Sequence, residues 1–276
     1  MEGNLKRVMT LVRRRRSVRT FDGNPLREED AAKILEFAQR EKNPYGIPID
    51  WQMLSAEKDG LTTPVIVGAD TFFTGKMQPV EHAEEAFGYA LERIVLYAQS
   101  MGIGSTWIAG TMDRSAFERA IGLAEDEVMP CVTPLGYPAE KMSLREGMMR
   151  KGVKADSRLP FDQLFFEGSF DRPLQYGAAG EFSDLLEIVR WAPSAVNKQP
   201  WRLVVDQENR QIHLFEKQSR GYVSATGWDL QKVDMGIALC HLMLGLKEMG
   251  YEPAVEVADP GIIAPQDTKY VVTCRW

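Results

Sequence analysis

An internal repeat is the feature that most constrains the fold, because two halves with the same residue pattern are expected to fold alike. The string Ile-Leu-Glu-Phe-Ala at residues 34–38 resembles Leu-Leu-Glu-Ile-Val at residues 185–189. In both places a proline-containing loop then leads to a tryptophan. Residues 88–102 likewise match residues 236–250 without a gap. The matched segments recur in the same order, about 150 residues apart.

Similar apolar positions are expected between any two amphipathic helices, but a shared order and spacing are not. We therefore expect a single domain over residues 1–276, built from two diverged, pseudo-symmetric halves at about 1–165 and 176–276. Two fused copies are free to diverge, so each can keep a different part of one ancestral site.

The composition is that of an ordinary globular protein, with 44% hydrophobic and 26% charged residues. The net charge of −6 gives no bulk electrostatic support for nucleic-acid binding. No apolar run approaches the roughly 20 residues of a membrane span, and the N-terminus lacks the apolar core of a signal peptide. Three widely spaced cysteines without a Cys-x-x-Cys motif favour a reducing compartment over a disulfide or metal framework. We expect a cytoplasmic protein without nucleic-acid, membrane or metal partners.

Hydrophobic periodicity predicts a mixture of helices and strands without strict βαβ alternation, which indicates an α+β fold. The residues from 141 to 158 are polar and basic, so we expect them to form a surface arm. Helices are expected at about 4–14, from 27 onward, 79–101, 113–121, 181–191 and 229–249. Strands are expected at 64–67, 129–135, 202–205, 211–216, 255–257 and 270–273.

The segment Arg15-Arg16-Ser17-Val18-Arg19 carries the residue types of a phosphate site. In an extended chain Arg15, Ser17 and Arg19 face one way, with two guanidinium forks around a hydroxyl that suit a phosphate monoester. The segment follows the C-terminal end of a helix, whose dipole disfavours anions, so the side chains would have to hold the phosphate. A solvated basic run and a nucleic-acid patch are the alternatives.

A second segment, residues 192–201, reads Ala-Pro-Ser-Ala-Val-Asn-Lys-Gln-Pro-Trp directly after a predicted helix. Its two prolines forbid regular helix, while Ser194, Asn197 and Gln199 offer groups that both donate and accept hydrogen bonds. A flavin ring edge alternates acceptors with one donor and suits such groups better than charges. A capped helix followed by a polar turn is the alternative, but it does not account for the whole string.

Together these segments resemble two signatures of the nitroreductase family of FMN enzymes, in the internally duplicated, single-chain form of the Thermotoga-like members. The resemblance implies a nitroreductase-like fold, with an antiparallel-rich sheet flanked by helices around a long central pair. Family members are typically homodimers in which one subunit supplies the arginine element, which is residues 15–19 here, and the other supplies the proline loop, which is residues 192–201 here. This chain carries each element once, in opposite halves.

The resemblance also implies which residues bind FMN. Residues 102–110 are similar to the family segment that passes the reactive N5 edge of the flavin, where a backbone N–H near Gly110 would donate to N5 as the catalytic group. The cofactor-binding residues implied are Arg15, Arg16, Ser17, Arg19, Ile108, Ala109, Gly110, Arg158, Pro193, Ser194, Ala195, Asn197 and Gln199.

Two positions depart from the family pattern. Many members carry an acidic residue where this chain has Ala109, so substrate handling is expected to differ. Arg158 matches the arginine of a family Lys-x-Arg pair that reaches the phosphate, but Asp156 stands at the lysine position, and Lys154 is a possible substitute.

The activity implied by the resemblance is hydride transfer from NAD(P)H through FMN N5 to a small-molecule electron acceptor, such as a nitroaromatic or a quinone. Another flavin reaction of the same superfamily and a flavin-binding or redox-sensing protein without turnover are the alternatives. Because residues 43–51 and 173–180 replace the missing copies of the two signatures, we expect one FMN per chain. The chain would then be a monomeric pseudo-dimer or a weak homo-oligomer. Candidate pocket aromatics in loops are Tyr45, Phe73, Tyr222 and Trp228.

Overall fold

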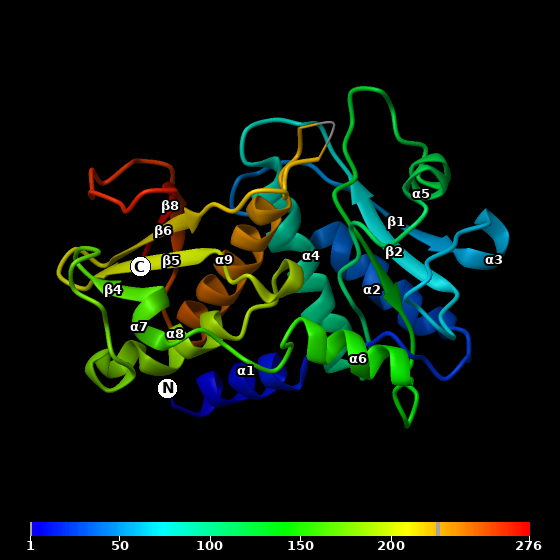
Figure 1. The fold of residues 1–276 in the computed structure, drawn as a ribbon, viewed down its shortest axis with the longest axis horizontal. Coiled ribbons are helices and arrows are strands. Elements are labelled where there is room, and N and C mark those ends of the chain that lie inside the picture. Colours follow the sequence, from blue (N-terminus) through cyan, green and yellow to red (C-terminus); the bar gives the residue numbers. More distant parts are fainter. Residues whose placement is uncertain (1, 225–226) are drawn as a thin grey trace. The chain divides into compact units, whose positions relative to one another are not determined.

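The computed structural model describes residues 2–224 and 227–276, and the chain divides into two compact units (Figure 1). Unit 1 consists of Met1–Arg13 and Ser157–Trp276, and unit 2 is Arg14–Asp156. The boundary near residue 156 lies close to the expected end of the first half. The first 13 residues, however, group with the later part of the chain.

Unit 2 has a three-stranded antiparallel sheet in the order β1-β2-β3, and helices accompany it. Three acidic residues in the first turn of α2 suit the positive end of its dipole, and its apolar residues Ile34 and Ala38 recur at helical spacing and are buried. The elements are α2 (Glu28–Arg40), β1 (Asp50–Ser55), α3 (Ala56–Asp59), β2 (Thr71–Lys76), α4 (Ala83–Ser100), α5 (Arg114–Ala120), β3 (Val132–Leu135) and α6 (Leu144–Gly152).

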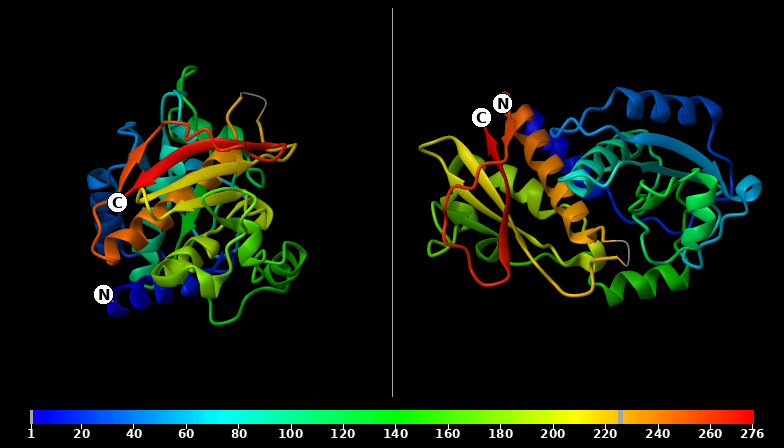
Figure 2. Two further views of the ribbon diagram at one scale, coloured as in Figure 1. Left: turned by 90° about the vertical axis from the view of Figure 1, so that its left-hand side faces the viewer. Right: turned by 90° about the horizontal axis from the view of Figure 1, so that it is seen from above.

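Unit 1 has a five-stranded sheet in the order β4-β5-β6-β8-β7, in which β4 and β5 run parallel and the remaining neighbours are antiparallel. Helix α9, apolar nearly all round, lies against β5 and β6 (Figure 2). The elements are α1 (Glu2–Arg14), α7 (Phe161–Leu164), β4 (Phe165–Glu167), α8 (Ser183–Arg190), β5 (Trp201–Asp206), β6 (Gln211–Lys217), α9 (Leu230–Glu248), β7 (Ala254–Glu256) and β8 (Thr268–Arg275), with 3₁₀ turns η1 (Tyr176–Ala178), η2 (Gly180–Phe182) and η3 (Ala195–Asn197).

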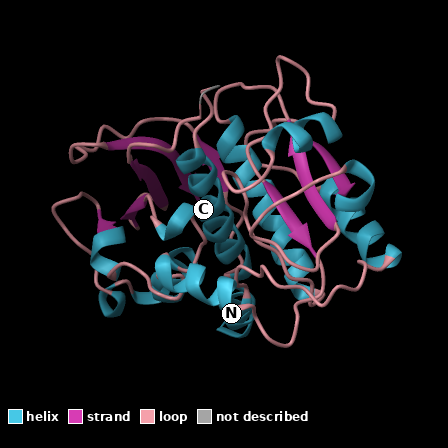
Figure 3. Ribbon diagram, turned by 45° about the vertical axis from the view of Figure 1, so that its right-hand side comes forward, coloured by secondary structure: helices cyan, strands magenta, loops and turns pink. Residues whose placement is uncertain are grey.

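The two units repeat one order of elements: a helix, two paired strands, a long helix and a further strand that pairs with the second. Figure 3 shows the mixture of helices and strands that these elements form. In unit 2 this series is α2, β1, β2, α4 and β3, and in unit 1 it is α8, β5, β6, α9 and β8. The class is α+β with antiparallel-rich sheets, as the sequence predicts.

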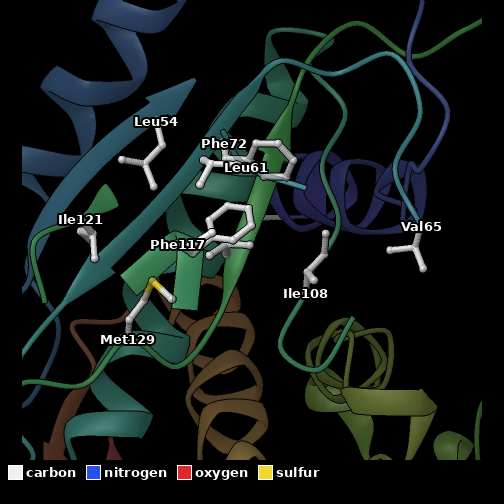
Figure 4. Close-up of a cluster of buried hydrophobic side chains, with 10 residues drawn as sticks. Leu54, Leu61, Val65, Phe72, Ile108, Phe117, Ile121 and Met129 are labelled. Carbon is white, nitrogen blue, oxygen red and sulfur yellow. The ribbon is translucent and has the colours of Figure 1, made fainter. Parts of the chain in front are cut away.

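The hydrophobic core of unit 2 on one face of its sheet joins strand residues to the short helix α5 (Figure 4). Phe117 of α5 is fully buried and packs edge-on against Phe72 of β2, with ring centroids 5.1 Å apart. Ile108, one of the candidate site residues, belongs to the same cluster, as does Met129. Packing of this kind holds the segment around Ile108 in place.

Three expectations from the sequence are wrong. Residues 64–67 form no strand; Val67 makes a single bridge with Thr20, and the strand of this region is β2, a few residues later. Residues 141–158 are not a plain arm, because they include helix α6, whose first turn is capped by the Ser143 hydroxyl. Phe73 lies in β2 rather than in a loop, fully buried with its ring stacked on Trp51, so it lines no pocket.

None of the helices in the described part of the chain combines the length and apolar character that crossing a bilayer requires. The three cysteines are buried, and burial raises the pKa of the Cys274 thiol to about 12.

Candidate functional site

The site residues expected from the sequence fall in both units. Unit 2 holds the arginine element and the segment that ends at Gly110, whereas unit 1 holds Arg158 and the loop from Pro193 to Gln199. Within unit 2 the first two are brought together: Ser17 forms a parallel bridge with Ser105, and the Val18 N–H donates to the Ser105 carbonyl at 2.9 Å.

The arginine element is extended, as expected, and its buried side chains are those of Arg15 and Val18. Val18 is buried in the core, while Ser17 and Arg19 on the other side of the chain are half-buried. Phe21 continues the bridged run through its N–H, which donates to the Val67 carbonyl at 2.8 Å. Backbone bonding on both sides thus fixes the direction in which the polar side chains point.

Arg15 is a buried cation with unmet hydrogen-bonding capacity. Its side chain is 5% exposed, and its nearest recorded counter-charge is Glu92, with 4.0 Å between Nε and Oε1. Among residues 2–224 and 227–276, neither Nε nor Nη1 of Arg15 has a hydrogen-bond acceptor. Burial lowers the pKa of Arg15, attraction to Glu92 opposes this, and repulsion from Arg150 lowers it further. A guanidinium in this state fits a bound anion such as a phosphate.

The side chain of Arg16 forms an ion pair with Glu146. Its Nη1 lies 2.9 Å from Oε1 of Glu146, a carboxylate on α6 that is almost fully buried. The other oxygen of Glu146 accepts from the Arg19 N–H at 3.1 Å and from the Thr20 hydroxyl at 2.8 Å. Glu146 therefore fixes the backbone of the arginine element, and in this arrangement Arg16 positions the element.

The backbone around Ile108 is anchored on both sides. Ile108 exchanges two backbone hydrogen bonds with Val132, at 2.9 and 2.8 Å. The Ala109 carbonyl accepts from Arg114, which also bonds the carbonyls of Met129 and Pro130. The next residue, Gly110, is exposed and has open space beside its Cα. Its backbone is thus approachable on a fixed support, which the expected role of its N–H requires.

The loop of unit 1 holds an unusual backbone. Val196, Asn197 and Gln199 all have positive φ, at 44°, 58° and 51°. For a β-branched residue such as Val196 this left-handed conformation is an outlier that costs about 1–2 kcal/mol. Strain of this kind persists only where surrounding contacts impose it, and it gathers at functional sites.

Hydrogen bonds from several elements hold that conformation. The Ser194 hydroxyl accepts from the Gln199 N–H at 2.8 Å, and the Gln199 carbonyl oxygen Oε1 accepts from the Leu159 N–H at 2.9 Å. The Asn197 amide donates to the Ser157 carbonyl at 3.1 Å. These contacts assign Gln199 the supporting role that the resemblance implies.

Asp234 of α9 fixes the same loop from the helix side. Both of its oxygens accept from the Ala195 N–H, at 3.0 and 3.1 Å, and the residue is almost fully buried. Burial raises the pKa of Asp234 well above its usual range; the Ala195 bond opposes this, and repulsion from Asp229 and Glu216 adds to it. The loop is therefore held by a buried carboxyl group whose charge is strongly disfavoured.

Arg158 packs against the helix that precedes the loop. Its guanidinium carbon lies 4.6 Å from the ring centroid of Trp191, and Nη2 donates to the Trp191 carbonyl at 3.3 Å. Nη1 donates to the Ser157 carbonyl at 2.7 Å. Arg158 thus caps α8 and braces the segment that accepts from Asn197.

Three residues of these assemblies were missed by the sequence reasoning: Glu146, Arg150 and Asp234. Glu146 and Arg150 stand four apart in a helix that was not expected. Asp234 offered a signal, because a lone acidic residue interrupts an apolar helix at 233–246, where an unpaired charge would be costly.

No group of three or more His, Cys, Asp or Glu side chains suited to a metal occurs among the described residues.

Comparison with known proteins places the chain in a family. Among curated proteins, it is 28% identical over 187 residues to an Archaeoglobus fulgidus protein named "Putative NADH dehydrogenase/NAD(P)H nitroreductase", which covers 60% of this chain and 99% of that protein. Among solved structures, a "putative nitroreductase" from Thermotoga maritima is 18% identical, with a TM-score of 0.63 over 97% of this chain and 92% of that one. This likeness confirms the nitroreductase-like fold.

A profile of the family described as "Putative TM nitroreductase" matches residues 7–246. The match spans both units and includes both sequence signatures. The family resemblance inferred from the sequence is thus confirmed. Since the profile covers most of the chain, the chain belongs to this nitroreductase family.

Proposed function

We propose that the chain is an FMN-dependent oxidoreductase that passes hydride from NADH or NADPH to a small acceptor of the nitroaromatic or quinone type. Membership of the nitroreductase family supports the class of reaction. The observation that carries the cofactor assignment is Arg15, a buried guanidinium with two nitrogens that lack acceptors in the described structure. It stands in the family's arginine element, where an FMN phosphate would supply the missing oxygens.

The proposed FMN-binding residues are those that the family resemblance implies, and each unit contains some of them. Arg15, Ser17 and Arg19 bind the phosphate, and Arg16 keeps the element in place through Glu146. Pro193, Ser194, Ala195 and Asn197 contact the ring and the ribityl chain, with Gln199 and Arg158 as their supports. Ile108 and Ala109 belong to the same proposed set, in the segment that ends at Gly110.

The chemistry that FMN supplies when bound is electron transfer from a reduced nicotinamide to the acceptor. The protein's part is to orient the ring and to offer a hydrogen-bond donor where negative charge develops. The exposed Gly110, anchored through Arg114 and Ile108, is the proposed donor through its backbone N–H. A donor on a fixed backbone needs no reorganisation during the reaction.

The same proposal includes duplication and one FMN per chain. The matching order of helices and strands in the two units supports a duplicated origin. In unit 2 the loop at 43–51 has no proline–serine signature, and Tyr45 within it stacks on His82 with ring centroids 4.9 Å apart. A chain that contains both halves of one site can work as a monomer.

An absorbance spectrum and a stopped-flow reaction test the proposal. Purified protein is expected to carry close to one flavin per chain and to lose its absorbance at about 450 nm when mixed with NADH or NADPH. Absence of bound flavin after reconstitution with FMN would contradict the cofactor assignment. Bound flavin that is not bleached would favour a binding or sensing role over turnover, and two flavins per chain would contradict the single-site proposal.

A further inference from the structure

Helix α6 (Leu144–Gly152) is fastened to the arginine element at several points. Glu146, 1% exposed, bonds Arg16, the Arg19 N–H and the Thr20 hydroxyl. At the start of the helix, the Ser143 N–H donates to the Thr20 hydroxyl at 3.0 Å. The side of α6 that carries Glu146 therefore faces the arginine element.

Arg150 stands one turn after Glu146 on that same side of the helix, since residues four apart in a helix lie on one face. Its side chain is 13% exposed, although arginine is among the residues that most often lie in solvent. Arg145, which lies on another side of the same helix, is exposed. The attachment of α6 through Glu146 thus brings Arg150 out of solvent and toward the arginine element.

Arg150 lies one turn after Glu146, the residue that bonds Arg16 and the Arg19 N–H, and its charge acts on the same arginine element. Its charge contributes to the lowered pKa values of both Arg15 and Arg19, for which burial is the larger cause. The counter-charge recorded for Arg150 is Asp156, with 2.5 Å between Nη2 and Oδ1. The Asp156 side chain is 80% exposed, and an ion pair with so exposed a partner contributes little stability and exchanges readily.

We propose that Arg150 is a third arginine of the phosphate site, which binds the terminal phosphate of FMN and gives up Asp156 when it does so. The guanidinium groups of Arg15, Arg19 and Arg150 could provide one fork for each of the three terminal oxygens of a phosphate monoester dianion. Such a ligand offsets their mutual repulsion, which otherwise opposes folding of this region. The inference rests on the proposed function, because it adds a ligand to the same site.

The test compares FMN with riboflavin, which has the same ring and ribityl chain but no phosphate. Dissociation constants for both flavins are measured by fluorescence quenching on the flavin-free full chain, for wild type, Arg150→Ala and the matched control Arg145→Ala. For Arg150→Ala, FMN binding is expected to weaken about tenfold to a hundredfold, while riboflavin binding changes less than about twofold. Arg145→Ala removes the same charge from an exposed position and is expected to change neither constant more than about twofold.

Two further variants complete the design. Asp156→Asn removes the competing carboxylate and is expected to leave FMN binding unchanged or tighter. Arg150→Lys keeps the charge but loses the fork, so its FMN affinity is expected to lie between wild type and Arg150→Ala; it also serves if Arg150→Ala does not fold. Inorganic phosphate should compete with FMN in wild type and less well in either Arg150 variant, which distinguishes a phosphate contact from a contact with the flavin ring.

Two outcomes would overturn the role of Arg150 without affecting the proposed function. One is an equal loss of FMN and riboflavin affinity in the Arg150 variants. The other is an FMN affinity of Arg150→Ala that equals the FMN affinity of Arg145→Ala. If wild type bound neither flavin, the proposed function itself would fail.

Discussion

The loop that follows α2 in unit 2 differs sharply from the loop that follows α8 in unit 1. In unit 2 it is organised by Asn43, whose amide donates to the Ile47 carbonyl at 2.7 Å and accepts from the N–H groups of Tyr45 and Ile47 at 3.2 Å each. The left-handed residue of that loop is Gly46, at φ 67°. In unit 1 the corresponding loop puts Val196 in the left-handed region instead.

The difference supports the proposal that the two units retained different parts of one site. The loop of unit 2 satisfies its own backbone groups and uses glycine where the chain turns, so it is a relaxed turn. The loop of unit 1 is strained, and it keeps its shape through Asp234, Ser194 and the Leu159 N–H. Strain that is supported from several directions is expected where a ligand must be met by a preformed surface. We therefore regard the loop of unit 1 as the functional copy.

The largest expected effect is on FMN binding. Measuring FMN affinity in variants of the strained loop and of the arginine element tests whether both segments bind the same ligand. Arg15→Ala removes a buried charge-assisted contact, so FMN affinity is expected to fall by about 1.5–3 kcal/mol. Asn197→Ala, which lies in the other unit, is expected to weaken FMN binding as well. Titration of the flavin-free protein measures both, and Arg14→Ala, an exposed arginine next to Arg15, is the control. Wild-type affinity in Asn197→Ala would break the single-site interpretation.

The second comparison concerns the helix pairs behind the two loops. A Cβ on Gly245 of α9 would lie 2.4 Å from the Leu185 side chain of α8. In unit 2 the pair α2 and α4 is bridged by Phe37 stacked on Tyr97, with ring centroids 4.3 Å apart. Close packing without room for a methyl group predicts that Gly245→Ala lowers the free energy of unfolding by about 1–3 kcal/mol.

Urea unfolding measures this loss. Gly147→Ala is the matched control, since it lies in helix α6 with nothing within 4 Å of the added Cβ, and it is expected to be neutral or to stabilise by about 0.5–1 kcal/mol. Because the two residues are in contact, the double variant Leu185→Ala/Gly245→Ala should lose less stability than the sum of the losses in the two single variants. If Gly245→Ala behaved like Gly147→Ala, the close approach of α8 and α9 would be wrong.

The third prediction concerns the pH dependence of the support beneath the strained loop. Burial raises the pKa of Asp234 above its unfolded value, so the folded state binds the extra proton. Its contribution to stability is complete below about pH 3.9 and is lost as the pH rises toward the folded-state pKa, with a slope of at most about 1.4 kcal/mol per pH unit. Asp234→Asn, which keeps a carbonyl acceptor for Ala195, is expected to gain stability relative to wild type across that range.

Unfolding free energies of wild type and Asp234→Asn, measured from pH 4 to 8, test the sign. A difference that stays constant with pH would mean that Asp234 titrates normally. Tyr222 provides an independent indicator of the same environment, because burial raises its pKa and the charge of Asp234 adds to the shift.

The smallest effect is expected from exchanging the backbone preferences of the two loops. Val196→Gly relieves the left-handed strain but adds freedom to the unfolded chain, so a net gain in stability of about 0.5–1 kcal/mol is expected. Gly46→Ala places a side chain in a left-handed conformation and is expected to cost about 1 kcal/mol, although open space surrounds it. A loss of stability in Val196→Gly would mean that the loop is not strained, and the contrast between the two copies would disappear.

Several elements could be predicted because their signal is local. Helices α4 and α8 follow from apolar residues at helical spacing, and α9 follows from a long segment that is apolar nearly all round. Strands β5 and β6 follow from short apolar runs. Strands β1 and β2 were missed, and residues 64–67 were expected as a strand instead. An apolar run between Pro64 and Gly68 satisfies local strand propensity, but which strands pair depends on partners that lie far away in sequence.

The sequence by itself determined the family, the duplicated pattern and the two segments proposed to bind the flavin, because these depend on the identity and order of residues. Tertiary structure decided how those segments are held, since a support can come from any distance along the chain. Glu146 fixes the arginine element from more than a hundred residues away, and Asp234 fixes the loop from another helix. No local pattern encodes such contacts; they arise because buried polar groups must find partners wherever the fold places them.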